Sequence, residues 1–398
     1  MPGGSKKWLM TLVKLAVCAG AIWYLSGKIT INDYVRLEDS PEVKHRLLSE
    51  SGDDLRIRDG RTGLEREVHR SQLAAQERLK NNQRPVEYGL RYVMRGTQWS
   101  WALWAFITMG PATFVIAWRL RLLLTTQDIS LSLRDAVLLS FAGNFFNFAV
   151  PGTTGGDLYK AYYIAKQTHK RAEGVTIVFL DRVIGLISFL LLATGAIFIS
   201  WGKDMIGVYG QWVGYLMAAF IVSGCMFFSR RLRRLIRYEQ LIRRLPFGDK
   251  LRRVDDTAFR FRYHPRKTVL ALAGSIGLHF LCVFSAYCLA RGLGVAPGAG
   301  RTYGDMYLAC LLAFVVGYLF AAAPVSFQGI GILEAVFIRV LVDGHWCSMN
   351  QMIAMTIGLR LIQIVWSLPG VIVPWLGFGR PPAESQAEGA IAEVEAPR

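Results

Sequence analysis

The chain has 398 residues, with 46 Lys and Arg against 29 Asp and Glu, so that its net charge is +17. Hydrophobic residues make up 53% of the chain and charged residues only 19%, and the mean hydropathy is +0.30. Few soluble proteins combine that hydropathy with so little charge, which excludes an ordinary soluble globular protein. The six cysteines are scattered and form no C-x-x-C pair, which excludes a disulfide framework.

Six apolar stretches are long enough to cross a membrane, since a helical span needs about 20 residues at about 1.5 Å of rise each. They cover residues 8–26, 98–118, 175–200, 207–228, 268–290 and 351–376. Two further apolar segments are shorter, and each runs into a proline that glycines follow. We expect these to form re-entrant hairpins over residues 136–164 and 306–338. The fold class predicted is an all-α polytopic membrane protein with about six full spans and two broken hairpins.

The orientation follows from the positive charges of the short loops. Residues 229–267 carry 14 Lys and Arg against four Asp and Glu, so we expect this loop to be cytoplasmic. The first stretch follows two lysines and has a weak cleavage site, but Lys14 favours a retained signal anchor (residues 1–26) over a cleaved signal. Six crossings then predict a multi-pass protein of the bacterial cytoplasmic membrane with both termini in the cytoplasm.

Residues 27–96 form a soluble extracytoplasmic insert in this topology. Asp59-Gly60 separates two segments of strand-like pattern and predicts a short hairpin. Residues 71–81 predict an exposed helix. The insert is a candidate surface for an envelope protein. The tail, residues 377–398, is rich in Ala, Glu and Pro, which is typical of a disordered segment.

The two broken segments resemble each other. In residues 149–164 and 322–338 an apolar run ends at a proline, then a glycine pair or G-x-G follows, then a charged residue, Ala, one residue, an aromatic residue and Ile. Lys160 in the first copy matches Glu334 in the second. In the predicted topology the copies enter the membrane from opposite sides, so the halves 97–228 and 268–376 form an inverted repeat.

Inverted repeats with Gly- and Pro-broken helices are typical of transporters, whose substrate site lies at the breaks. An interrupted helix frees backbone N–H groups and the positive end of its dipole at low dielectric, where they can hold an anionic group. The alternative is that Pro and Gly only kink packed helices.

Ionisable side chains at membrane depth are costly unless they are paired or face water, so they are functional candidates. Gly156 and Arg182 are 26 residues apart, and so are Glu334 and Arg360. An arginine fork suits a lipid phosphate, which either arginine could clamp where the two halves meet. The structural alternative is that Asp157 or Asp181 pairs with Arg182, and Glu334 with Arg360. Both interpretations can hold together.

The predicted substrate site combines the hairpin residues with the embedded charges. Its members are Asn144, Pro151, Gly152, Gly155, Gly156, Asp157, Lys160, Asp181, Arg182, Gly329, Gly331, Glu334 and Arg360. Signatures of metal, nucleotide and serine chemistry are missing, so we expect no catalytic residue, metal or cofactor. The basic loop predicts contact with anionic lipid headgroups rather than with nucleic acid.

Four motifs carry a resemblance to a known family. They are Arg119-Leu-Arg-Leu-Leu-Leu, Asn144-Phe-Phe-Asn-Phe-Ala-Val-Pro-Gly-Thr-Thr-Gly-Gly-Asp-Leu-Tyr-Lys-Ala-Tyr, Leu180-Asp-Arg-Val-Ile-Gly-Leu and Gln328-Gly-Ile-Gly-Ile-Leu-Glu-Ala. Together they resemble the lysylphosphatidylglycerol synthase transmembrane-region family, also described as flippase-like, over about residues 100–376 and the first span. The longer insert 27–96 and the sequence after Pro324, which has no glycine doublet, depart from the family pattern.

The resemblance implies a bacterial or archaeal membrane protein that moves or presents a lipid across the bilayer. In two-part members a soluble aminoacyltransferase domain follows, and we expect this chain to have only the membrane part. The function predicted first is therefore a flippase-like transporter of an anionic phospholipid or lipid-linked substrate. The alternatives are a lipid-modifying enzyme, for which Asp157, Asp181 and Glu334 are the available acids or bases, and an envelope scaffold subunit that binds through the insert.

Overall fold

The computed structural model describes residues 16–75, 85–149, 155–199, 263–298, 300–322 and 326–376, with a few positions between 211 and 218. The chain divides into two compact units. The first comprises Met1–Thr108, Val283–Ala321 and Ile330–Ile362. The second comprises Met109–Cys282, Ala322–Gly329 and Gln363–Arg398.

Five helical stretches in the described residues are long and apolar enough to cross a membrane, so the protein is a multi-pass membrane protein. They are Trp99–Gln127, Arg171–Ile199, Pro265–Gly292, Tyr303–Ala321 and Met349–Trp375. Four coincide with predicted spans. The predicted span at 8–26 is described only from residue 16, as the short apolar helix Ala16–Ser26. The one at 207–228 lies outside the described residues, apart from a few positions.

One part of the predicted fold class is not confirmed, and another needs correction. Helix α13 (Tyr303–Ala321) is continuous over 19 residues and is long and apolar enough to cross a membrane, so the second re-entrant hairpin is not confirmed. The helix begins ahead of the apolar run, because Thr302 Oγ1 accepts from the N–H of Asp305, at 3.2 Å, and caps it. The chain is also not all-α, because the insert contains a β-sheet.

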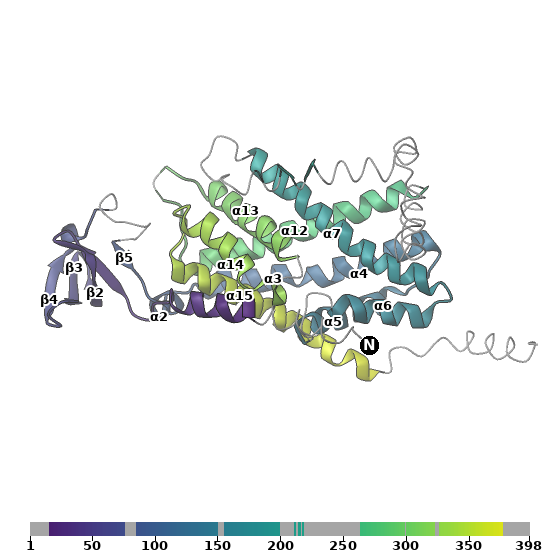
Figure 1. Cartoon of the computed structure of the whole chain (residues 1–398), viewed down its shortest axis with the longest axis horizontal. Coiled ribbons are helices and arrows are strands. Elements are labelled where there is room, and N and C mark those ends of the chain that lie inside the picture. The colour runs from purple at the N-terminus through teal and green to yellow at the C-terminus, as the bar shows by residue number, and fades with distance from the viewer. Residues whose placement is uncertain are drawn as a thin grey trace, which may run out of the picture. The chain divides into compact units, whose positions relative to one another are not determined.

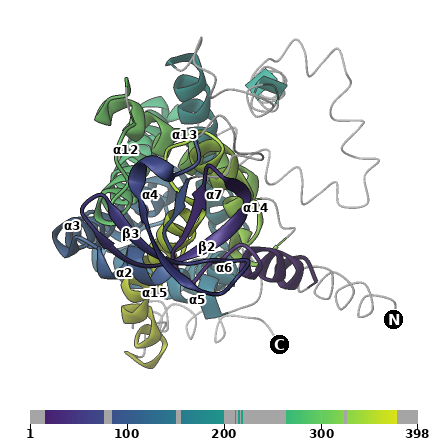
Figure 2. The same ribbon diagram turned by 90° about the vertical axis from the view of Figure 1, so that its left-hand side faces the viewer.

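The sheet lies in the first unit and is antiparallel throughout, in the order β4-β3-β2-β1-β5. Figures 1 and 2 show its ribbon, with β2 and β3 labelled in both. Its strands are β1 (Tyr34–Leu37), β2 (Ser40–Ser51), β3 (Asp54–Arg58), β4 (Glu65–His69) and β5 (Val86–Glu87). Alternate residues of these strands pack into one apolar core. The core residues are Val35, Leu37, Leu47, Leu55, Ile57 and Val68.

The predicted hairpin around Asp59-Gly60 is confirmed, since β3 and β4 pair across this turn. The helix predicted at 71–81 is wrong at its start. Residues Arg70–Gln72 form a single 3-10 turn, η1, and Leu73 then bridges to Leu37. At this point the apolar Leu73 pairs with the sheet instead of continuing a helix. Residues 76–84 lie outside the described residues.

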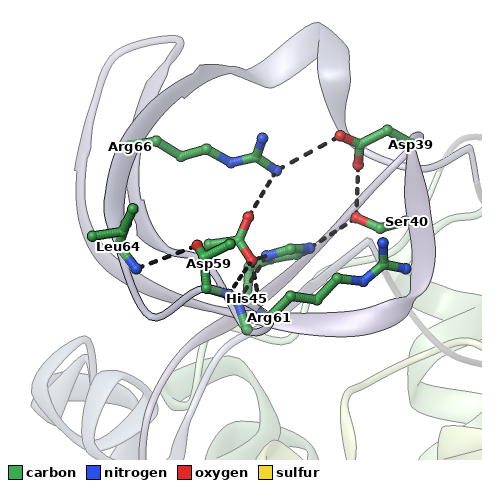
Figure 3. A network of polar contacts seen from close by, with 9 residues as sticks. Asp39, Ser40, His45, Asp59, Arg61, Leu64 and Arg66 are labelled. Atoms are coloured by element: carbon green, nitrogen blue, oxygen red, sulfur yellow. Dashed lines mark hydrogen bonds and ion pairs between the residues drawn. The ribbon is translucent and has the colours of Figure 1, made fainter.

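A polar network beneath the β3–β4 turn is visible in Figure 3. The buried His45 accepts from the N–H of Gly60 at Nδ1, 3.1 Å, and lies 2.9 Å from Ser40 Oγ at Nε2. Because Nδ1 is an acceptor, the ring proton is assigned to Nε2, which donates to Ser40, and the Ser40 hydroxyl donates to Asp39 at 2.6 Å. The network connects the β3–β4 turn at Gly60 to the start of β2 at Ser40. Burial lowers the pKa of His45.

The helices of the first unit include α2 (Leu90–Arg95), most of α3 (Trp99–Met109), α13, α14 (Ile332–Phe337), the π-helical turn η6 (Ile338–Val342) and most of α15 (Met349–Ser367). Gly317 on α13 leaves room for Leu333 on α14. The buried Asn350 at the start of α15 donates to Thr30 Oγ1, at 2.7 Å, and to the carbonyl oxygen of Tyr88, at 2.8 Å. One amide therefore holds both ends of the sheet insert.

The second unit contains α4 (Pro111–Leu124), α5 (Leu133–Ala149), α6 (Gly155–Gln167), α7 (Arg171–Ile199) and the first part of α12 (Pro265–Gly292), with the 3-10 turns η3 (Thr125–Gln127), η5 (Phe327–Gly329), η7 (Leu368–Val371) and η8 (Val373–Leu376) (Figure 1). Pro111 starts α4, where its missing N–H is not needed. Their apolar faces share one core. Its buried members are Leu120, Leu123, Leu124, Ile129, Leu139, Tyr163, Ile164, Ile177, Val178, Ile184 and Ala271.

Candidate functional site

The first broken segment brings α5 and α6 into very close contact. A Cβ on Gly156 would collide with the carbonyl oxygen of Gly143, so the two helices can approach only because Gly156 has no side chain. Asn147 on α5 accepts from the N–H of Gly156 at 2.9 Å and so caps the start of α6. The carbonyl oxygen of Asn147 accepts a hydrogen bond from Gln328 Nε2. The sequence prediction missed both Asn147 and Gln328.

Asp157 is the third residue of α6 and forms an ion pair with Arg182 on α7. Arg182 Nη1 donates to Asp157 Oδ2 at 2.6 Å. The two side chains are 30% and 27% exposed, so the pair is only partly buried. A carboxylate in the first turn of a helix is also favoured by the helix dipole. The predicted pairing of Asp157 with Arg182 is therefore confirmed.

The second broken segment is followed by a short helix with an equivalent pair. Gly331 precedes α14 with a φ of +88°, a left-handed conformation that glycine tolerates. Glu334 is the third residue of α14 and is 5% exposed. Its Oε2 accepts from the N–H of Gly331 at 2.7 Å, and its Oε1 accepts from Arg360 on α15 at 2.8 Å. The predicted pairing of Glu334 with Arg360 is confirmed.

The two segments thus share a pattern that corrects the alignment made from sequence. In each, the third residue of the helix after the break is an acid, and it pairs with an arginine 25 or 26 residues later on a long apolar helix. By its position in the helix and by its arginine partner, Asp157 is more similar to Glu334 than Lys160 is. Position within the helix decides this, because only the first turn places a carboxylate beside the free N–H groups.

Asp181 does not pair with Arg182, contrary to the alternative that was considered. Its two oxygens accept from Arg119 on α4, at 2.6 and 2.9 Å, and both side chains are buried. Ser275 on α12 accepts from the same guanidinium at 2.7 Å. The second span was predicted to end at residue 118, but α4 continues to Leu124, so that Arg119 is buried among the packed helices.

The other predicted site residues occupy varied places. Asn144 donates to Thr113 Oγ1 at 3.1 Å, and Gly155 is the first residue of α6. Lys160 is buried, and its side chain lies against Gly143. Gly329, in η5, has a φ of +69°. Pro151 and Gly152 lie outside the described residues.

The chemistry of this arrangement is electrostatic. Asp157, Asp181 and Glu334 each accept from an arginine, so that each of the three carboxylates has a cationic partner. In the ranges that the structure describes, no group of three or more His, Cys, Asp or Glu side chains is arranged to hold a metal ion. The arrangement can hold helices together, and it can present cationic forks to an anion.

A family model described as "Lysylphosphatidylglycerol synthase TM region" matches residues 89–370. The match begins after the last strand of the sheet and contains the pairs of Asp157, Asp181 and Glu334 with arginine, and it confirms the predicted resemblance. A comparison with curated proteins found no match.

Proposed function

Because the chain belongs to the lysylphosphatidylglycerol synthase transmembrane-region family, we propose that it is a flippase-like transporter that moves an anionic phospholipid or a lipid-linked substrate across the membrane. One observation carries the proposal. After each Pro- and Gly-containing break, a helix begins with an acid at its third residue, and a membrane helix further along supplies an arginine partner.

Breaks of this kind are expensive in a bilayer unless they serve a polar ligand. A helix that starts at membrane depth presents N–H groups and a positive dipole end, which favour an anionic headgroup. In our proposal the two breaks are halves of an inverted repeat, with the first entering from the cytoplasm and the second from outside. Both termini are then cytoplasmic.

Because its pair with Asp157 is only half-buried, Arg182 is suited to exchange this carboxylate for a phosphate. Arginine prefers a bidentate oxygen partner, and a lipid phosphate offers the same geometry as a carboxylate. With 27% of its side chain exposed, Arg182 can be approached by a phosphate that competes with Asp157. Glu334 is more deeply buried, so the pair with Arg360 is better suited to fix the start of α14.

Membrane lipids are the partners in this account. The sheet insert, in which strands β2 and β4 expose charged side chains, is proposed as the surface for an envelope protein.

The test is leaflet exchange in proteoliposomes that contain a fluorescent phosphatidylglycerol. Dithionite added outside bleaches only the outer leaflet of protein-free vesicles, roughly half of the signal. With the protein present, we expect bleaching to continue well beyond that fraction, and chromatography of the lipids to find no new species. A new lipid species without leaflet exchange would favour a lipid-modifying enzyme instead.

A further inference from the structure

The second unit contains a buried lysine that the ion pairs do not use. Lys160 on α6 is 4% exposed. Arg119, Arg182 and Arg360 each have a carboxylate partner, whereas the ammonium group of Lys160 has no hydrogen bond or ion pair within the described part of the chain. A lysine residue buried to this extent without a counter-ion is unfavourable, so an anion that reaches its ammonium group would be stabilised.

The side chain of Lys160 packs against α5 at Gly143, which is also in contact with Gly156 near the start of α6. It crosses Gly143, where a Cβ would collide with Lys160 Cε. The carbonyl oxygen of Gly143 also faces Gly156 in the first turn of α6. Side chains on a helix lean toward its N-terminus, and from this rule we infer that the ammonium end is close to the first turn. Gly143 and Gly156 therefore make room both for the helix contact and for the lysine.

The local charges suit a singly charged anion. Asp157 is balanced by Arg182, so Lys160 leaves one positive charge at the first turn of α6. The dipole of this 13-residue helix adds to it. A phosphodiester carries one negative charge and accepts hydrogen bonds through two oxygens.

We propose that Lys160 and the first turn of α6 bind the phosphodiester of a lipid headgroup. This rests on the proposed function and assigns the first phosphate contact to Lys160, with Arg182 still paired with Asp157, rather than to Arg182 or Arg360. A free phosphate has the same chemistry, so the test must separate the two sources.

The experiment is isothermal titration calorimetry on the purified full chain in detergent. The probes are dihexanoyl phosphatidylglycerol and, separately, inorganic phosphate. Lys160→Met removes the charge with little change in length, and Lys160→Gln is a second uncharged variant should the first fail to fold. Lys160→Arg keeps the charge. Lys166→Met is the matched control, because Lys166 is exposed on the same helix.

We expect the unsubstituted chain and Lys166→Met to bind the short-chain lipid alike, and Lys160→Met to bind it at least about tenfold more weakly, as expected for the loss of one charge-assisted contact. Lys160→Arg should retain most of the affinity. Equal lipid affinity in a folded uncharged variant would overturn the proposal. Lys160-dependent binding of inorganic phosphate alone would overturn the lipid assignment.

Leaflet exchange separates this proposal from the function on which it rests. Lys160-dependent lipid binding without leaflet exchange by the unsubstituted chain would support the site and overturn the transporter. Leaflet exchange by the unsubstituted chain, with lipid affinity unchanged in Lys160→Met, would support the transporter and overturn the site.

Discussion

Glu334 links the first turn of its own helix to Arg360. One carboxylate oxygen accepts from the N–H of Gly331, at 2.7 Å, and the other accepts from the guanidinium, at 2.8 Å. The acid therefore serves as a helix cap and as an ion-pair partner at once. Removal of either partner leaves a charge at low dielectric, so the pair should behave as a unit when it is mutated.

Arg360→Ala should lower the free energy of unfolding by roughly 3 kcal/mol or more, because it leaves Glu334 buried and unpaired. Glu334→Ala combined with Arg360→Ala should be more stable than Arg360→Ala alone. Thermal unfolding of the purified variants in one detergent measures this coupling. Strictly additive effects of the two substitutions would show that the residues do not interact.

Arg119→Met should be among the most destabilising single changes in the second unit. It leaves Asp181 without its bidentate partner among packed helices, at about 3–5 kcal/mol. Arg121→Met is the matched control, since Arg121 is exposed two residues further along and bonds only to the carbonyl oxygen of Leu131 among the contacts described. The control should stay within about 0.5 kcal/mol of the unsubstituted chain. Equal unfolding temperatures for the two variants would contradict the buried assignment of Arg119.

Gly156→Ala should reduce both stability and yield, because its Cβ would meet the carbonyl oxygen of Gly143 and force α5 and α6 apart. Gly195→Ala on α7 tests the same substitution where the added Cβ meets nothing. That control should be neutral or stabilising by up to about 1 kcal/mol, since alanine is the better helix former. Fluorescence-detected size exclusion of the two variants gives the comparison, and equal profiles would argue against the close contact.

The sheet insert should lose stability as the pH falls below about 6.5, the ordinary pKa of histidine. Burial lowers the pKa of His45 in the fold, so the unfolded insert binds the proton more readily between the folded and unfolded pKa values. Stability is therefore complete above pH 6.5 and decreases below it. Hydrogen exchange of residues 34–69 in the full chain, corrected for intrinsic rates, measures this. A His45→Gln variant should lose the pH dependence, and an unchanged dependence would assign it to another group.

Orientation can be tested with single cysteines at two exposed positions. Glu67→Cys in the sheet should react with an impermeant maleimide in intact spheroplasts, and His169→Cys before α7 should react only after lysis. The native cysteines in the described residues are buried or partly buried, so the unsubstituted chain supplies the background. The reverse labelling pattern would invert the proposed topology.

The spacing of the embedded charges predicted part of the arrangement. The intervals from Gly156 to Arg182 and from Glu334 to Arg360 indicated that a long helix carries an arginine at a similar distance after each break, and the pair of Glu334 with Arg360 followed as the structural alternative. For Arg182 the sequence left Asp157 and Asp181 open as partners, and the structure has Asp157. Arg119 was not predictable in the same way. The predicted span was ended before Arg119 because a charged residue lowers the local hydropathy. The charge of Arg119 is paired with Asp181, so the helix continues beyond it.

Two other misses have physical causes. The alignment of Lys160 with Glu334 matched charged residues before Ala, although the start of a helix selects the acid in its first turn. The role of Gln328 depends on a contact 181 residues away in the chain, which no local pattern contains. In the insert, the turn signal predicted β3 and β4, but the distant pairing of β1 with β5 had no local signal.

The most direct measurement of the central claim is leaflet exchange of fluorescent phosphatidylglycerol by the unsubstituted chain, compared with Asp157→Asn and Glu334→Gln in the same vesicles. Both substitutions keep the shape of the side chain and remove the charge that pairs with an arginine. We predict that the unsubstituted chain exposes lipid from the inner leaflet to dithionite, and that both folded variants are much slower. Bleaching by the unsubstituted chain that stops at the level of protein-free vesicles would contradict the account.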